Sequence, residues 1–294
     1  MAIGKDQVTV VVPTYNEEKA IGMVLDELFE AGYKNVLVVD GYSVDATVKL
    51  AESRGVPVVL QNGPGKTGAI RTALDFVKTP YMLVMDGDYT YCAKDIERFL
   101  SHGGRYMQVV GVRDRVYMNW VHRAGNWMIT RTFNLLLGAG LSDVCSGMYL
   151  LRTDVARKLE FQSRGFRTEV EVVAQTVMDG DVTEVPVGYR PRVGKRKLST
   201  WRHGFEIISA ILGLARRYNP VLLFSAIAGL SIFPAGVILG WVGLQLLLFG
   251  AFHSWWAMMG LLLLLLASQA LAVSTISVLL KRSERRIMQA LRKE

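Results

Sequence analysis

The 294-residue sequence predicts an α/β domain with a mostly parallel sheet, followed by two membrane-spanning helices. Two observations support this prediction. Short apolar runs alternate with helical patterns as far as about residue 198, which is typical of right-handed βαβ units. From Pro220 to Leu280 the chain has no Asp, Glu, Lys or Arg, and a run of this length holds two bilayer-spanning helices of about 20 residues each.

The expected strands are short apolar runs, as is typical where a parallel sheet is covered on both faces. They span residues 8–12, 36–39, 56–60, 82–85, 107–112, 148–151 and 182–187. The expected helices span residues 17–31, 44–54, 93–101, 120–137 and 167–178, and one more ends at Val77. Glu17 and Glu18 favour the start of the first helix, because acids stabilise the positive end of the helix dipole, and Ser43 can cap the second.

Composition divides the chain into four parts. Residues 1–198 form the predicted α/β domain. Residues 199–218 are amphipathic and are expected to lie on the membrane surface. Residues 219–281 form the predicted transmembrane hairpin, with helices at about 221–245 and 256–280, and residues 282–294 form a basic tail.

The net charge of +8 is concentrated beside the membrane segment. Residues 188–217 carry +7 and residues 281–294 carry +4, which leaves −3 for the rest of the chain. This is the positive-inside pattern, which places both ends of the hairpin in the cytoplasm and residues 249–256 at the outer turn. Clustered Lys and Arg attract anionic lipid headgroups, so we expect a lipid bilayer as a partner and no nucleic acid.

Cys92 and Cys145 are the two cysteines, and their spacing argues against a zinc site or a disulfide framework. The N-terminus leads directly into a strand, so no cleavable signal is expected. The sequence shows no Ser-His-Asp or Cys-His pattern that would indicate nucleophilic catalysis.

Acidic residues follow two of the predicted strands. Asp86 and Asp88, separated by Gly87, come directly after strand 82–85, and Asp40 ends strand 36–39. In an open α/β sheet, ligands bind at the carboxyl ends of the strands. Two carboxylates in Asp-x-Asp suit Mg²⁺ or Mn²⁺ carrying a nucleotide's phosphates, although Asp-Gly-Asp also forms ordinary turns. Asp40 could accept hydrogen bonds from a base or a ribose.

Basic residues supply a second set of candidates. Gly65-Lys66-Thr67 resembles the end of a P-loop, but Leu60 stands where that motif needs its first glycine. Lys66 either faces phosphate or is solvated. Arginines follow strands or lie on the next helix at positions 113, 115, 123, 131, 190 and 192. Because Arg binds phosphate bidentately, several of them at one edge would mark a site for an anionic substrate. Glu169 and Glu171 are interpreted as ordinary acids at a helix N-terminus.

Taken together, these motifs resemble the family 2 glycosyltransferases, which have the Rossmann-like GT-A fold. Within that family they are similar to the polyprenyl-phosphate or dolichyl-phosphate glycosyltransferases, such as dolichol-phosphate-mannose synthase and the archaeal dolichyl-phosphate hexose transferases. The matching segments are residues 11–18 (VVPTYNEE), 38–40 (VVD), 86–88 (DGD), 144–147 (VCSG) and 194–198 (GKRKL). The resemblance covers nearly all of residues 7–218 and makes residues 1–198 a GT-A glycosyltransferase domain.

The resemblance implies three groups of site residues. Those around the nucleotide-sugar are Pro13, Tyr15, Glu17, Asp40, Asp86, Arg190 and Arg192, to which we add Lys66. Those on Mg²⁺ or Mn²⁺ are Asp86, Asp88 and, as the candidate third ligand, Thr90. Those near the acceptor phosphate are Arg113, Arg123 and Ser146, and the residues expected to act in catalysis are Asp88, Arg113 and Arg123.

Two departures from the mannose synthases bear on the donor. Those enzymes usually have Asp-Asp-Gly-Ser after the second strand and Gln at the position of Thr90, where this chain has Asp40-Gly41-Tyr42-Ser43 and Thr90. The pattern looks more like the archaeal enzymes that use a UDP-sugar. We therefore expect a metal-dependent, inverting hexosyltransferase that moves glucose or N-acetylglucosamine from UDP to dolichyl or polyprenyl phosphate, for protein glycosylation. Its catalytic domain and both termini would lie on the cytoplasmic side of the cell membrane.

Other functions stay open at this point. A dolichol-phosphate-mannose synthase would use GDP-mannose instead. A processive polysaccharide synthase would normally have further membrane helices and a Gln-rich signature, which are not visible. Transfer to a protein or another lipid, or a non-catalytic adaptor that binds nucleotide-sugar, is also compatible with the sequence, as is an oligomer.

Overall fold

The computed structural model describes residues 3–161, 168–194, 213 and 220–291, with only the backbone of residues 179 and 281–291. The chain forms two compact units, Met1–Ile211 and Leu212–Glu294, and each is described by itself. The predicted amphipathic helix at 199–218 lies outside the described residues, apart from Gly213.

The first unit is built on one seven-stranded sheet with the order β3-β2-β1-β4-β6-β5-β7. The strands are β1 (Val8–Thr14), β2 (Val36–Asp40), β3 (Val58–Leu60), β4 (Tyr81–Val84), β5 (Gln108–Arg113), β6 (Tyr149–Arg152) and β7 (Val182–Val187). Strand β6 runs antiparallel to both of its neighbours, β4 and β5, and every other neighbouring pair is parallel. The prediction of a mostly parallel sheet is confirmed.

The antiparallel strand β6 determines which segments of the chain meet at one edge of the sheet. Strands β1, β2, β4, β5 and β7 all end at the same edge of the sheet, and β6 begins there because it runs the other way. We call this the carboxyl edge. Segments far apart in the chain, such as the loop after Val84 and the residues before Tyr149, therefore lie next to each other.

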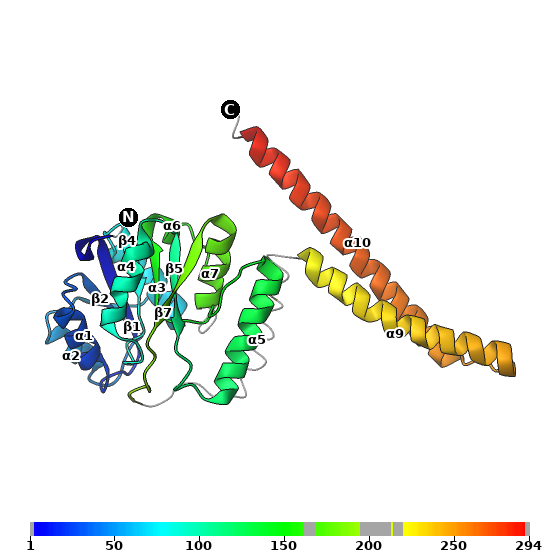
Figure 1. Cartoon of the computed structure of the whole chain (residues 1–294), viewed down its shortest axis with the longest axis horizontal. Coiled ribbons are helices and arrows are strands. Elements are labelled where there is room, and N and C mark those ends of the chain that lie inside the picture. The colour runs from blue at the N-terminus through cyan, green and yellow to red at the C-terminus, as the bar shows by residue number, and fades with distance from the viewer. Residues whose placement is uncertain (1–2, 162–167, 195–212, 214–219, 292–294) are drawn as a thin grey trace. The chain divides into compact units, whose positions relative to one another are not determined.

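Helices cover both faces of the sheet, as Figure 1 shows. They are α1 (Ile21–Glu30), α2 (Thr47–Glu52), α3 (Gly65–Phe76), α4 (Ile96–Gly103), α5 (Trp120–Leu137), α6 (Thr153–Ala156) and α7 (Thr168–Asp179). Because side chains alternate along a strand, Val10 and Val12 of β1 pack with Leu25 of α1, whereas Val11 packs with Ile70 of α3 on the opposite face. The domain thus has three layers and two apolar cores.

Two predicted helix starts are wrong. The helix expected from Glu17 begins at Ile21, since Asn16 has a left-handed φ of 51° and the Glu17 amide donates to Thr47 Oγ1 at 2.7 Å. The helix expected from residue 44, with Ser43 as its cap, begins at Thr47. The hydroxyl of Ser43 instead donates to Asp40 at 2.6 Å and accepts from the amide of Asn16, in the loop after β1, at 2.7 Å. In both places the polar groups connect the loops after β1 and β2 rather than starting a helix.

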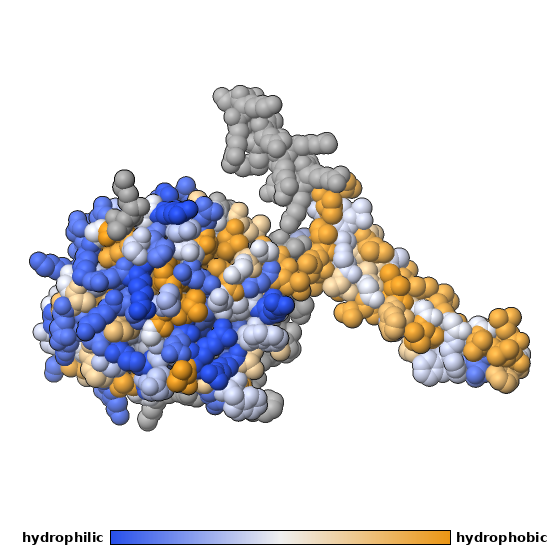
Figure 2. All heavy atoms as spheres, in the orientation of Figure 1, coloured by the Kyte–Doolittle hydropathy of each residue, from blue (hydrophilic) through white to orange (hydrophobic). Residues whose placement is uncertain are grey.

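The second unit contains α9 (Pro220–Phe249) and α10 (Ser254–Leu291), joined by a short turn. By length and composition, Pro220–Phe249 and Ser254–Leu280 are each able to cross a membrane. Their surfaces are dominated by apolar side chains (Figure 2). The Ser225 and Ser274 hydroxyls are 3.0 Å apart, and the rings of Trp241 and His253 stack with centroids 4.9 Å apart. The first contact joins α9 to α10, and the second packs the connecting turn against α9. Helix α10 continues into the predicted basic tail.

A buried ion pair joins β5 to the segment that enters β6. Arg113, the last residue of β5, donates to Asp143 through Nε at 2.7 Å and through a terminal nitrogen at 2.8 Å. The side chains are only 8% and 2% exposed. The amide of Asp143 donates in turn to Glu184 of β7 at 2.9 Å. Asp143 therefore binds the end of β5 through its carboxylate and binds β7 through its backbone amide, in the segment that leads into β6.

This linkage predicts a large loss of stability when the carboxylate is removed. Asp143→Ala leaves the Arg113 charge buried and unpaired, so the free energy of unfolding should fall by about 3–5 kcal/mol. Thermal or denaturant unfolding of the purified protein measures it. Asp154→Ala is the matched control, because its pair with Arg152 is exposed (45% and 56%) and should contribute less than about 1 kcal/mol. Equal losses in the two variants would contradict this account.

Candidate active site

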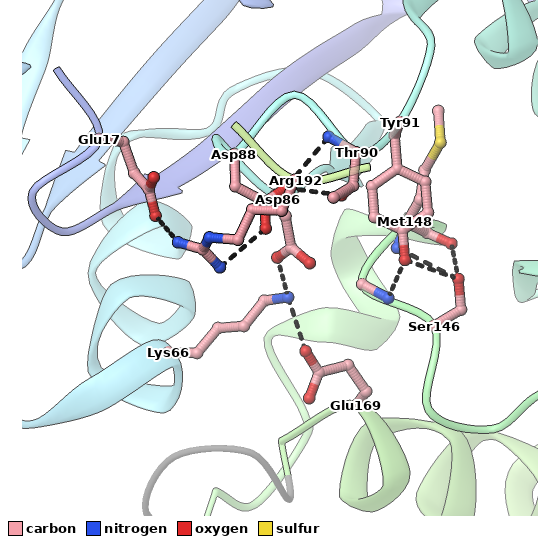
Figure 3. Close-up of polar contacts among 11 residues, drawn as sticks. Glu17, Lys66, Asp86, Asp88, Thr90, Tyr91, Ser146, Met148, Glu169 and Arg192 are labelled. Carbon is pink, nitrogen blue, oxygen red and sulfur yellow. Dashed lines mark hydrogen bonds and ion pairs between the residues drawn. The ribbon is translucent and has the colours of Figure 1, made fainter. Parts of the chain in front are cut away.

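The loop after β4 carries two carboxylates against the end of β1. A Cβ added to Gly87 would lie 2.9 Å from Thr14 Cγ2 and 3.2 Å from Val12 Cγ1, so only glycine fits between Asp86 and Asp88. Figure 3 shows both carboxylates next to the cationic side chains of Lys66 and Arg192. The close approach of the loop to β1 places the two acids at the carboxyl edge, as the sequence predicts.

Asp86 is partly exposed and lies against the beginning of β6. A Cβ added to Gly147 would come within 2.0 Å of Asp86 Oδ2. The amide of Gly147 donates to the buried Tyr91 hydroxyl at 2.7 Å, which fixes the backbone at this point. Because Gly147 has no side chain, the backbone at Ser146-Gly147 leaves room for the Asp86 carboxylate.

Asp88 is more deeply buried and has three hydrogen-bond donors around it. Its Oδ1 accepts from the Thr90 hydroxyl at 2.6 Å and from the Thr90 amide at 3.2 Å, and its Oδ2 accepts from Arg192 at 2.9 Å. Arg192 also forms a close ion pair with Glu17. Burial, and then the charge of Asp86, raise the pKa of Asp88. Four predicted site residues from three segments thus form one network.

Lys66 connects the other carboxylate to a residue that was not predicted. Its ammonium group forms a close ion pair with Asp86 and a second one with Glu169 at 2.6 Å. Burial lowers the pKa of Lys66, but the charges of Asp86 and Glu169 outweigh burial and leave it above its ordinary value. Burial raises the pKa of Glu169. The acid interpreted as an ordinary helix N-terminal residue therefore belongs to the site, at the first turn of α7.

Arg190 and Arg192 take different positions. Arg190 forms a bidentate pair with Glu27 of α1 at 2.7 and 2.9 Å and lies 3.9 Å from the ring centre of Tyr89. This hydrogen-bonded pair lowers the pKa of Glu27. Arg192 is the one of the two that reaches Asp88. The alternation of Tyr-Arg-Pro-Arg puts the two guanidinium groups on different partners.

The loops after β1 and β2 contain the remaining residues predicted at the nucleotide. The Asp40 carboxylate is fully buried and accepts from Thr14 at 3.1 Å and from the Ser43 amide at 2.7 Å. The Asp40 carboxylate therefore stabilises the loop that follows β2. Pro13 is partly buried, whereas Tyr15 is 50% exposed at this edge.

Among the residues that the structure describes, three other than glycine have a left-handed backbone, and all three lie at the carboxyl edge. Asn16 (φ 51°), Tyr42 (φ 65°) and Tyr89 (φ 67°) follow β1, β2 and β4 respectively. Such conformations cost of order 1–3 kcal/mol each and tend to cluster at functional sites. Their position supports the assignment of this edge as the active site.

The three residues predicted near the acceptor phosphate differ in exposure. Arg113 is buried against Asp143, with its guanidinium 5.5 Å from the ring centre of Tyr189. Ser146 is 1% exposed, and its hydroxyl is 3.4 Å from that of Tyr91. The Arg123 side chain is exposed on α5. Exposed apolar residues lie on α5 and just before it at Val116, Tyr117, Trp120, Trp127 and Met128.

The Asp86 and Asp88 carboxylates fit a divalent cation that shares its ligands with a substrate. Within the described part of the chain, no three His, Cys, Asp or Glu side chains converge as a complete metal cage. Mg²⁺ is commonly held by one or two carboxylates together with substrate phosphates and water. The hydroxyl of Thr90, which touches Asp88, is the further oxygen that this loop offers.

The contact between Gly147 and Asp86 predicts a selective effect on cation binding. Gly147→Ala forces the Asp86 carboxylate aside, so Mn²⁺ affinity should fall by about 10–100-fold, as for other residues that orient metal ligands. Electron paramagnetic resonance of free Mn²⁺ measures the affinity. Gly140→Ala is the control, because nothing lies within 4 Å of its added Cβ. Unchanged affinity in folded Gly147→Ala protein would show that Asp86 is not a ligand.

Comparison with known proteins agrees with the resemblance. The model of the family described as "Glycosyl transferase family 2" matches residues 9–160, which run from the second residue of β1 to beyond β6 and include the Asp86/Asp88 loop. Glycosyltransferase AglJ of Haloferax volcanii is 34% identical over 233 residues, covering 76% of this chain and 76% of the relative. The dolichyl-phosphate hexose transferase of the same organism is 32% identical over 215 residues, covering 70% of this chain and 93% of the relative.

Solved structures share the fold. Glucosyl-3-phosphoglycerate synthase of Mycobacterium tuberculosis, in complex with Mn²⁺, UDP-glucose and phosphoglyceric acid, superposes with a TM-score of 0.60. It is 20% identical, and the match covers 71% of this chain and 79% of that chain. With a GT-A-like fold, a family model across more than half of its length and relatives above 30% identity, the chain belongs to glycosyltransferase family 2 and is a glycosyltransferase.

Proposed function

We propose that the enzyme transfers a hexosyl or N-acetylhexosaminyl group from a UDP-sugar to dolichyl or polyprenyl phosphate, giving a lipid-linked sugar for protein glycosylation. The observation that carries this proposal is the pair of carboxylates at the carboxyl edge. Asp86 is paired with Lys66, and Asp88 is paired with Arg192. The similarity to a dolichyl-phosphate hexose transferase of Haloferax volcanii supports the acceptor. The UDP-glucose and Mn²⁺ of the solved neighbour support the donor and the cation.

The donor side of the reaction needs positive charge near the leaving diphosphate. Asp86 and Asp88, with Thr90 beside them, would hold Mg²⁺ or Mn²⁺, which when bound offsets the negative charge that develops on the leaving group. Lys66 and Arg192 add fixed cations within the same cluster. Tyr15, exposed at this edge, is available to the nucleotide, and Asp40 holds the neighbouring loop in shape.

On the acceptor side, the reaction depends on correct positioning of the phosphate more than on a general base. A phosphate monoester has a second pKa of about 6, so it is already mostly dianionic at neutral pH and can attack the anomeric carbon directly. Arg113, oriented by Asp143, and the exposed Arg123 would hold the phosphate in line with the leaving group. The exposed Trp120 and Trp127 of α5 provide apolar surface for the lipid end of the acceptor.

The membrane assignment follows from the second unit and the charges around it. Residues 219–281 would anchor the enzyme in the cell membrane, with residues 199–218 on its surface. The basic residues at 188–217 and 281–294 favour the cytoplasmic side for the catalytic domain, residues 1–198, and for both termini. The enzyme would then meet its lipid acceptor where the phosphate headgroup is exposed.

A transfer assay tests the proposal directly. Purified protein in detergent is given dolichyl phosphate and Mg²⁺ or Mn²⁺ with UDP-glucose, UDP-N-acetylglucosamine or GDP-mannose. A metal-dependent glycolipid from one UDP-sugar is the expected result. Product from GDP-mannose alone would identify a mannose synthase, and no glycolipid from any donor would exclude this acceptor.

A substitution of Asp88, paired with a control substitution elsewhere, tests whether this carboxylate is needed for transfer. Asp88→Asn keeps the shape of the side chain but removes its charge, so transfer should fall by about 100-fold or more. The melting temperature, measured on the same protein, shows how far loss of the charged pair with Arg192 lowers stability. Asp75→Asn, on the exposed side of α3, removes the same charge elsewhere and should leave the rate unchanged. Near wild-type transfer by Asp88→Asn would show that the cation assignment is wrong.

A further inference from the structure

Lys66 lies between two carboxylates and is nearly withdrawn from solvent. Its ammonium group touches both Asp86 and Glu169 (Figure 3). Its side chain is 16% exposed, against 7% for that of Glu169. Lys66 comes from the first turn of α3 and Glu169 from the first turn of α7. Three segments of the chain therefore bring the Lys66 ammonium group onto the carboxylate that is also the candidate metal ligand.

The Oδ1 atom of Asp86 cannot bind the Lys66 ammonium group and a divalent cation favourably at the same time. Asp86 Oδ1 accepts from Lys66, and a divalent cation on that oxygen would be repelled strongly by an ammonium group at hydrogen-bond distance in a poorly solvated site. A cation that takes Oδ1 therefore requires Lys66 to leave Asp86. Leaving a buried ammonium group with no partner would be strongly unfavourable.

Glu169 offers the departing ammonium group a second anchor. It is already 2.6 Å from Lys66, and its other oxygen, Oε2, is buried without a hydrogen-bond partner among the described residues. An ammonium group has three N–H donors, so it can turn more of them to Glu169 as it leaves Asp86. The spare oxygen of Glu169 is the acceptor that such a shift requires.

We propose that Lys66 is a displaceable counter-ion of Asp86, and that Glu169 is the positioning residue that retains its ammonium group when a divalent cation takes the place on Asp86. This rests on the cation-dependent function proposed above. The exchange keeps the site close to charge balance before the cation binds and leaves Lys66 inside the site afterwards. There it remains available to the phosphates of the donor.

Binding of Mn²⁺ alone, followed by electron paramagnetic resonance on the full chain in detergent, tests the exchange without any turnover. Lys66→Gln removes the competing ammonium group, so Mn²⁺ affinity should rise by about tenfold. Glu169→Gln removes the second anchor, so affinity should fall by about tenfold. Lys49→Gln and Glu30→Gln change the same charges on exposed helix surfaces and should leave the affinity unaltered.

The double variant distinguishes two ways in which Glu169 could raise Mn²⁺ affinity. Glu169 could retain Lys66 away from the cation, or its own negative charge could attract the cation directly. If Glu169 acts through Lys66, Glu169→Gln should lower the affinity by less than about threefold when Lys66 is already Gln. Equal falls in the two backgrounds would mean that Glu169 acts on the cation directly, and would overturn its role as an anchor. Wild-type affinity in Lys66→Gln would overturn the competition itself.

A structure of the Mn²⁺-bound protein gives an independent reading if a variant does not fold. Lys66 Nζ should then contact Glu169 and lie beyond hydrogen-bond distance of Asp86. An ammonium group still on Asp86 beside a bound cation would overturn the proposal while leaving the proposed function in place. Absence of Mn²⁺ binding by both the wild type and Lys66→Gln would instead overturn the cation-dependent part of the proposed function together with this exchange.

Discussion

The reversal of a single strand is the constraint on which the site depends. In a sheet whose other strands all run one way, β6 begins where its neighbours end. That reversal brings Ser146-Gly147 against the Asp86 carboxylate and lets Asp143 reach Arg113. A parallel strand in the same place would present its other end to this edge. The chemistry of the edge is therefore a consequence of topology as much as of the residues themselves.

Charge balance is the second principle of the site. Carboxylates crowded at one edge repel each other, and each of Asp86, Asp88 and Glu27 is matched by a Lys or Arg that arrives from a distant part of the chain. These internal pairs hold the loops in place before any substrate arrives. A site built in this way is ordered by the same cations that a phosphate-bearing ligand would attract.

Local sequence patterns predicted the strands, α5 and the acids at strand ends, because apolar periodicity and strand-end position are local properties. The helix starts at Ile21 and Thr47 were missed, since tertiary hydrogen bonds between two loops override local capping preferences. Glu169 was also missed. An acid in a helix's first turn is commonplace, and only packing against Lys66 reveals that this one is buried. The apolar residues that follow it, Val170 to Ala174 with one further Glu, were the available signal.

In the membrane-spanning role proposed for it, the length of α9 has a consequence for the kind of membrane that would suit the enzyme. Its 30 uncharged residues extend about 45 Å, whereas the hydrocarbon core of a typical bilayer is about 30 Å thick. The excess has to be absorbed by tilt, by protrusion into the headgroup region or by local thickening of the lipid, and each has an energetic cost that depends on the surrounding lipids. In that role, membrane thickness would be a physical variable that sorts the enzyme among bilayers, independently of any recognition of its substrates.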